Sequence, residues 1–171
     1  MNRSSFSRFA FLLVAAILLT VSVASAAGPF QFFSVTPCRI ADTRPGFGFA
    51  GGFGPPALAG GVDRFFPITS APQCGIPSDA KAVALNVTVV SPTLEGFIKI
   101  WPSNQVKPAV STINFAAGEP AIANGAIVPL AVDAQGNTLA GNQIGVVYGT
   151  AVPGGNTHLI LDVTGFFKTV P

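Results

Sequence analysis

Two stretches of the sequence alternate between apolar and polar residues with a period of two, and they constrain the fold more than any other feature. The first is 81–90 (KAVALNVTVV) and the second is 159–167 (LILDVTGFF). Successive side chains of a β-strand point to opposite faces, so each stretch would bury one face in a core. The expected core-facing residues are Val83, Leu85, Val87 and Val89 in the first stretch, and Leu159, Leu161, Val163 and Phe167 in the second. We expect both stretches to be central strands of one antiparallel sheet.

Further short segments, separated by turn signals, occur throughout the chain. We expect strands at 30–35, 38–43, 64–68, 97–101, 110–115, 126–132 and 142–148, with 116–125 as a loop. Pro67 and Pro129 lack a backbone N–H, so their strands should lie at a sheet edge or contain a bulge. Eight or nine short, mostly antiparallel strands without a convincing helix predict an all-β fold. The expected architecture is a single β-sandwich, jelly-roll or immunoglobulin-like.

The first 27 residues have the three parts of a secretory signal peptide. Arg3 and Arg8 form a basic start, 9–23 is an apolar run, and 24–26 (ASA) is a small-residue cleavage site. An uncleaved membrane helix is the alternative, which the short apolar run disfavours. We therefore expect 28–171 to be one secreted domain, extracellular or periplasmic, with no membrane span after signal cleavage.

Charge is sparse and balanced in this sequence. Charged residues make up 9% of the 171 positions. Of the nine Lys and Arg residues, two belong to the signal peptide, which leaves seven against seven Asp and Glu residues. A near-neutral domain lacks the basic face that nucleic acid or an anionic membrane requires, so neither is expected as a partner. A surface poor in charge favours association with other surfaces.

Cys38 and Cys74 are the only cysteines, and in an exported chain they are expected to form one disulfide. Closing a loop of this length stabilises a fold by roughly 4 kcal/mol on the chain-entropy model. Two free thiols with a chemical role are the alternative. That alternative is disfavoured because the spacing is not C-x-x-C and no histidine lies nearby.

The segment 46–61 (GFGFAGGFGPPALAGG) is rich in glycine, which opposes regular structure. It carries three phenylalanines. Together with one tryptophan and one tyrosine elsewhere, these are candidates for an apolar or sugar-stacking surface. The five candidate residues are Phe47, Phe49, Phe53, Trp101 and Tyr148. The alternative is that these rings plug the ends of the sandwich.

Six motifs follow one another in an order that is typical of a known family. They are TPCRIADTR at 36–44, ALNVTV at 84–89, GFIKIWP at 96–102, STINF at 111–115, AN at 123–124 and LDVTGFF at 161–167. This order, over nearly the whole of 28–171, resembles a family of bacterial extracellular accessory β-domains. The resemblance implies a module attached to secreted hydrolases or repeated in surface proteins, with no established catalytic role. This chain differs by Cys38 before the first motif arginine and by the insert at 46–61.

Four polar residues within these motifs are candidates for a structural polar lock. Asp42 and Arg44 are two positions apart, so on an extended strand they share a face and could pair. Asn86 and Asp162 lie on the second face of the two central strands, where we expect them to be polar partners of each other. A ligand site at these residues is the alternative.

Catalytic constellations are not evident in the sequence. His158 is the only histidine, so a His-rich metal site is excluded, and no G-x-S-x-G elbow accompanies it. We expect no catalytic residue, no metal and no cofactor. The predicted function is that of a secreted, non-enzymatic structural or adhesion-type β-domain at the cell surface or outside the cell. Its expected partner is a cell-surface protein, a glycan or a second copy of the chain. The alternative is a carbohydrate-binding module for a cell-wall or environmental glycan.

Overall fold

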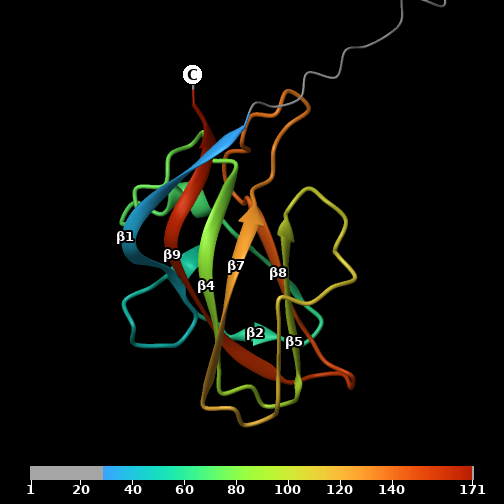
Figure 1. The fold of residues 1–171 in the computed structure, drawn as a ribbon. Coiled ribbons are helices and arrows are strands. Elements are labelled where there is room, and N and C mark those ends of the chain that lie inside the picture. Colours follow the sequence, from blue (N-terminus) through green and yellow to red (C-terminus); the bar gives the residue numbers. More distant parts are fainter. Residues whose placement is uncertain (1–28, 171) are drawn as a thin grey trace, which may run out of the picture.

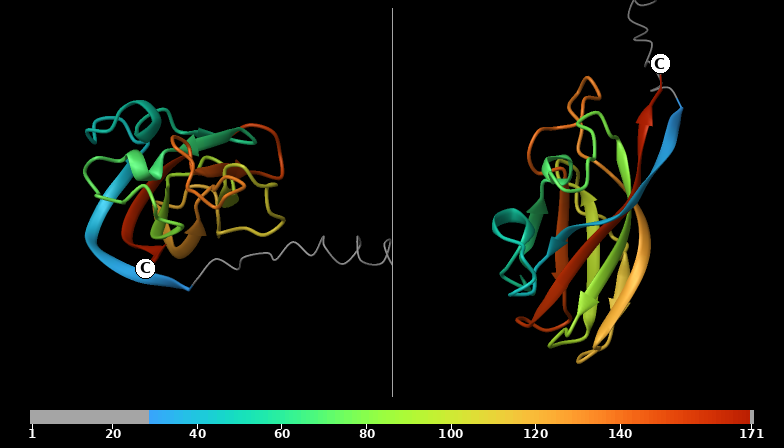
Figure 2. Two further views of the ribbon diagram at one scale, coloured as in Figure 1. Left: turned by 90° about the horizontal axis from the view of Figure 1, so that it is seen from above. Right: turned by 90° about the vertical axis from the view of Figure 1, so that its left-hand side faces the viewer.

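A computed structural model describes residues 29–170, so the signal peptide expected at 1–27 lies outside the described residues. The described chain forms two antiparallel β-sheets packed face to face (Figures 1 and 2). The strands are β1 (Phe30–Asp42), β2 (Leu58–Ala59), β3 (Asp63–Phe66), β4 (Ala82–Val90), β5 (Gly96–Pro102), β6 (Ile113–Phe115), β7 (Ala121–Pro129), β8 (Ile144–Gly149) and β9 (Asn156–Thr169). This confirms the predicted all-β sandwich. Between 29 and 170 no helix is long and apolar enough to cross a membrane.

The strand order decides between the two expected kinds of sandwich. One sheet has the order β1-β9-β4-β7, with the short β2 also paired to β9, and the other has the order β3-β8-β5-β6. At most connections the chain crosses from one sheet to the other. Strands β1 and β9, the first and last of the chain, are neighbours in the first sheet. With β2 set aside, this is the strand order of a jelly roll. The two stretches that alternate in the sequence, β4 and β9, are adjacent central strands, as predicted.

The hydrophobic core lies between the two sheets. On β4 the residues alternate between buried and partly exposed along the whole strand, as the period-two pattern requires. The opposite sheet contributes further buried apolar side chains. Members of the core include Val83, Leu85, Val87, Val89, Leu159, Leu161, Val163, Ile98, Ile100, Val146 and Tyr148. Burying each large side chain of this kind stabilises the fold by roughly 1.5–3 kcal/mol.

A β-bulge at Thr164 changes which face the end of β9 presents. Leu85 of β4 pairs with Val163, but the next residue, Ala84, pairs with Gly165. One extra residue inverts the alternation that follows it. As a result Phe166 packs against the core, whereas Phe167 faces outward. The expectation that Phe167 is core-facing is therefore wrong, because a regular alternation cannot anticipate a bulge.

Several element boundaries also differ from the prediction, and the two largest differences concern β1 and β7. The segments 30–35 and 38–43 belong to the single strand β1, because pairing with β9 continues on both sides of an irregularity. Strand β7 begins at Ala121, inside the expected loop 116–125, because its backbone pairs with the complete length of β4. This part of β7, AIANG, is mostly exposed and consists mainly of small residues, so no alternating pattern marks it in the sequence. Both prolines were placed correctly at edges, since Pro129 ends the edge strand β7 and Pro67 follows the edge strand β3.

Candidate functional site

Four charged side chains on and near β1 and β9 form what we call the ion-pair cluster, which consists of Arg39, Asp42, Arg44 and Asp162. Arg39 binds Asp162 in a bidentate fashion, with Nε donating to Oδ1 at 2.8 Å and Nη2 donating to Oδ2 at 3.3 Å. Arg39 Nη1 also donates to Asp42 Oδ2 at 3.0 Å. The cluster thus joins the edge strand β1 to the central strand β9 through charge-assisted hydrogen bonds.

Asp42 is the buried centre of the ion-pair cluster, with no exposed surface. Arg44 donates to it from the backbone N–H at 3.1 Å, from Nε at 2.9 Å and from Nη2 at 2.7 Å. Burial alone would raise the pKa of Asp42. The hydrogen bonds from Arg44 and the charges of Arg44 and Arg39 outweigh burial, so the pKa lies below its ordinary value. Two arginines and two aspartates leave the cluster without net charge.

The role of Arg39 was not foreseen from the sequence. It lies three positions before Asp42, and on a regular strand these two side chains would point to opposite faces. The pairing of β1 with β9 shifts between Arg39 and Ala41, which leaves Ile40 as an extra residue. This irregularity brings Arg39 and Asp42 to the same side. In the sequence, the position of Arg39 within the motif at 36–44 was the only indication of this role.

Asn86 does not pair with Asp162, although the two residues are directly opposite in the pairing of β4 with β9. The amide of Asn86 instead donates to Thr88 Oγ1 at 3.3 Å. Arg39, instead of Asn86, binds the carboxylate of Asp162. The predicted lock is therefore corrected by exchanging Asn86 for Arg39, and Asn86 remains beside the cluster with its amide oxygen unused among the described residues.

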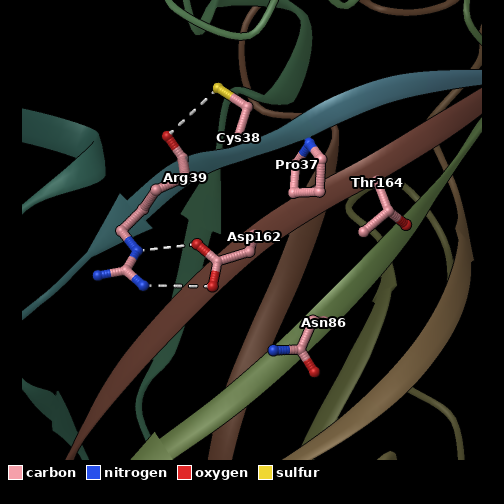
Figure 3. A pocket seen from close by; sticks show the side chains of 6 residues that line it. All are labelled: Pro37, Cys38, Arg39, Asn86, Asp162 and Thr164. Atoms are coloured by element: carbon pink, nitrogen blue, oxygen red, sulfur yellow. Dashed lines mark hydrogen bonds and ion pairs between the residues drawn. The ribbon is translucent and has the colours of Figure 1, made fainter.

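A cavity of about 550 Å³, which we call the sheet-face pocket, opens beside the ion-pair cluster on the outer face of the first sheet (Figure 3). It forms where β1 diverges from β9. The pairing passes from Ser34 with Gly165 to Cys38 with Val163, so three residues of β1 stand opposite the single Thr164. The pocket is lined by Pro37, Cys38, Arg39, Asn86, Asp162 and Thr164.

The disulfide predicted from the sequence joins Cys38 to Cys74, with an S–S distance of 2.03 Å. It links the pocket wall on β1 to the turn at 71–76. In the same turn, the side-chain amide of Gln73 donates to the carbonyl of Arg39 at 3.2 Å. The disulfide and Gln73 together hold the middle of β1 in place.

Two of the five aromatic residues expected to stack on a ligand are buried. Trp101 is 5% exposed and Tyr148 is 0% exposed, so neither ring offers a face to solvent. Trp101 lies close against Gly145, with the ammonium of Lys107 5.3 Å from the ring centre. Tyr148 is in the core and donates its hydroxyl to the carbonyl of Leu94 at 2.7 Å. A stacking role for these two rings is therefore wrong, and they match the alternative of aromatic packing.

The glycine-rich insert at 46–61 is partly exposed and partly packed. Phe47 is 52% exposed, and the guanidinium of Arg44 lies 3.6 Å from its ring centre. Phe49 is half-buried, and Phe53 packs against the core. Arg64 donates to backbone carbonyls of the insert, and burial lowers its pKa. Only Phe47 therefore offers a largely exposed ring, and its face is already engaged by an arginine.

Metal-ligating and acid–base side chains are sparse in the described part of the chain. Residues 29–170 contain no group of three or more His, Cys, Asp and Glu side chains that could hold a metal ion. His158 Nδ1 lies 3.0 Å from the carbonyl oxygen of Thr43. The hydrogen bonds and charges of its arginine partners lower the pKa of Asp42, so Asp42 does not resemble a general acid held near neutral pH.

Comparison of the chain with family models, with curated proteins and with solved structures finds no match. A jelly roll serves many unrelated functions, so the fold alone assigns none. The function must therefore be argued from the sheet-face pocket and from the exposed surfaces of this chain.

Proposed function

We propose that the chain is a secreted, non-enzymatic β-domain of the adhesion type, which binds a cell-wall or environmental glycan in the sheet-face pocket. The single observation that carries this proposal is the grouping of carboxylate, amide and hydroxyl groups in an open cavity of about 550 Å³. Cavities of this size accommodate small ligands or one end of a polymer. A disulfide in the pocket wall fits an oxidising compartment, which supports export.

The polar groups of the pocket suit a ligand with neighbouring hydroxyl groups. Each oxygen of Asp162 accepts one bond from Arg39 and can accept another from a ligand hydroxyl. The amide oxygen of Asn86 has no partner among the described residues, and the hydroxyl of Thr164, which donates to the carbonyl of Ala84 at 3.4 Å, can still accept a hydrogen bond. Sugars carry hydroxyl groups at adjacent ring positions, and each of these hydroxyls can donate to one such acceptor.

The balance of charge favours a neutral ligand over an anion. Among the described residues, Arg39 is the only cationic side chain that lines the pocket, and its charge is compensated by Asp162 and Asp42. A phosphate or sulfate in the pocket would meet the carboxylate of Asp162, and a guanidinium whose charge Asp162 and Asp42 already compensate. An uncharged glycan avoids that repulsion and can still accept and donate hydrogen bonds.

The test is retention of the exported protein on insoluble peptidoglycan and polysaccharides, with soluble sugars as competitors. We expect saturable binding to at least one glycan. We also expect Asn86→Ala and Thr164→Val each to weaken it about 3- to 10-fold, as the loss of one hydrogen bond implies. Asn142→Ala serves as the matched control, because Asn142 is an exposed asparagine that does not line the pocket.

Near-ultraviolet circular dichroism of the buried Trp101 and Tyr148 checks that each variant is folded. If the protein is retained on none of the glycans, or if the two pocket variants bind as well as Asn142→Ala does, the pocket is not the glycan site and this function is rejected.

A further inference from the structure

The beginning of β1 is an open sheet edge. Residues Phe30–Ser34 pair with Thr169–Gly165 of β9 on one side. Strand β1 is the outermost strand of its sheet, and no described strand pairs with its other side. In Figure 2 the start of β1 and the end of β9 run together at one end of the sandwich. The outward-facing backbone donors and acceptors of 30–34 can therefore accept another strand.

The rest of the same edge is closed. The amide of Gln73 donates to the carbonyls of Arg39 and Ile40, and the disulfide between Cys38 and Cys74 holds the turn against the strand. The carbonyls of Arg39 and Ile40, in this half of β1, thus have a partner from within the chain. The contrast between the two halves limits an added strand to 30–34.

The other sheet edges carry features that discourage pairing. Strand β7 ends in Pro129, and its Asn124 side chain donates to the carbonyl of Thr112, so that this edge is tied to its own molecule. Strand β3 has four residues, two of them charged, and β6 has three residues. Charges, prolines and short length are the usual protections of edge strands.

The open segment FQFFS has none of those protections. It contains no charged residue and no proline. Phe30 is 47% exposed and Phe32 is 46% exposed, and Phe32 faces outward with Phe167 on the same surface as the sheet-face pocket. Phe32 is held in place, because its ring lies over Gly165 and contacts Phe167 with the ring centres 5.0 Å apart. The edge is consequently ordered, apolar and uncharged.

We propose that two copies of this chain associate by antiparallel pairing of their 30–34 segments, with Phe32 opposite Phe32 of the second copy. The pair is isologous, with the same surface used by both copies. It joins the two sheets into one with the order β7-β4-β9-β1-β1-β9-β4-β7. Centring on Phe32 places Phe30 opposite Ser34 and makes an aromatic pair at the two-fold axis. A strand from another protein would need the same uncharged, aromatic pattern to pair equally well, whereas a second copy of this chain already has it.

The symmetry of this dimer places its two sheet-face pockets on the same side. Identical antiparallel neighbours in a sheet are related by a two-fold axis perpendicular to the sheet. Both copies therefore present the outer face of the first sheet on the same side. Each sheet-face pocket, with its wall on β1, then opens toward the same surface. A dimer could hold two sites of one polymer at once and so strengthen binding by avidity.

The experiment is sedimentation velocity of the exported protein over a range of concentrations. We expect a dimer with a dissociation constant on the order of 10 µM, because five paired residues per copy form an interface smaller than the roughly 1,600 Å² of a standard complex. The variants Phe32→Lys and Phe32→Glu should each weaken association at least tenfold, because like charges would meet at the two-fold axis. An equimolar mixture of these two variants should associate again.

The matched control is Ile127→Lys, which places the same charge on an exposed apolar residue of β7, at the opposite edge of the same sheet. It should leave the dimer intact. Hydrogen exchange of the wild-type protein adds a second readout, in which protection of 30–34 increases with concentration. The proposal is overturned if the wild-type protein stays monomeric at every concentration, or if the dimer is insensitive to Phe32→Lys or is lost in Ile127→Lys. It is also overturned if hydrogen exchange at 30–34 does not depend on concentration. None of these outcomes depends on whether the pocket binds a glycan.

Discussion

Arg39 and Asp162 lie 123 positions apart in the sequence and form a two-point ion pair, with Nε to Oδ1 at 2.8 Å and Nη2 to Oδ2 at 3.3 Å. This pair ties the edge strand β1 to the central strand β9. Through its remaining bond to Asp42, Arg39 also links the outer face of the sheet to a fully buried carboxylate. Stability and the shape of the sheet-face pocket therefore depend on the same few charges.

Asp42→Asn should lower the free energy of unfolding by about 3 kcal/mol, because two guanidinium groups lose the buried carboxylate that compensates them. Urea unfolding at pH 7 measures the change. Asp79→Asn is the control, since the Asp79 side chain is 56% exposed and pairs with Lys168 at 3.4 Å. We expect that control to change stability by less than about 0.5 kcal/mol. Equal effects of the two substitutions would show that the ion-pair cluster is not a stability centre.

Acid should destabilise the wild-type protein more steeply than Asp42→Asn. The pKa of Asp42 is lowered in the folded state, so on acidification the unfolded chain takes up a proton before the folded chain does. The stability due to Asp42 is fully present above the unfolded pKa of about 4, and is lost as the pH falls from there through the folded pKa. Urea midpoints measured between pH 7 and pH 2 test this. Parallel curves for wild type and Asp42→Asn would contradict it.

Removal of the disulfide should lower stability by roughly 4 kcal/mol on the chain-entropy model, because it reopens a loop of 36 residues in the unfolded chain. The double substitution Cys38→Ser with Cys74→Ser, compared with the oxidised wild type in urea, gives the value. Gln73→Ala in the oxidised protein separates the effect of the amide bonds to β1 from that of the disulfide. A double variant as stable as wild type would mean that the closed half of the β1 edge is held by Gln73 alone.

Trp101→Ala should destabilise the fold by about 3–5 kcal/mol, because it removes a large buried side chain. The folded fraction should bind glycan as wild type does, since Trp101 does not line the sheet-face pocket. Chemical unfolding and glycan retention, measured on the same preparation, separate the two effects. Lost retention with unchanged stability would restore Trp101 as a ligand contact.

The local patterns of the sequence were sufficient for the strands and for part of the core. Alternation with a period of two identified β4 and β9, and the structure confirms them as central neighbours. It could not identify the start of β7, where pairing with β4 rather than an apolar pattern makes the strand. It also misplaced Phe167, since a bulge at Thr164 depends on how three strands fit together.

For the candidate site, the sequence supplied the residues but not their partners. It named Asp42, Arg44, Asn86 and Asp162, and it missed Arg39, which lies opposite Asp162 in the pairing of β1 with β9 and reaches Asp42 because β1 has an extra residue at Ile40. It also offered Trp101 as a candidate for a stacking surface, with burial as the alternative, and packing against Gly145 and Lys107 buries the ring.

The sequence by itself determined the class of fold, because hydrophobic periodicity and turn residues act over a few neighbours and are readable one segment at a time. The tertiary structure decided which charges pair, where the sheet-face pocket opens and which half of the β1 edge stays free. Those features arise from register shifts between strands more than 100 residues apart in the chain. A shift of one residue reverses the direction of every side chain beyond it, and no local pattern encodes where such a shift will occur.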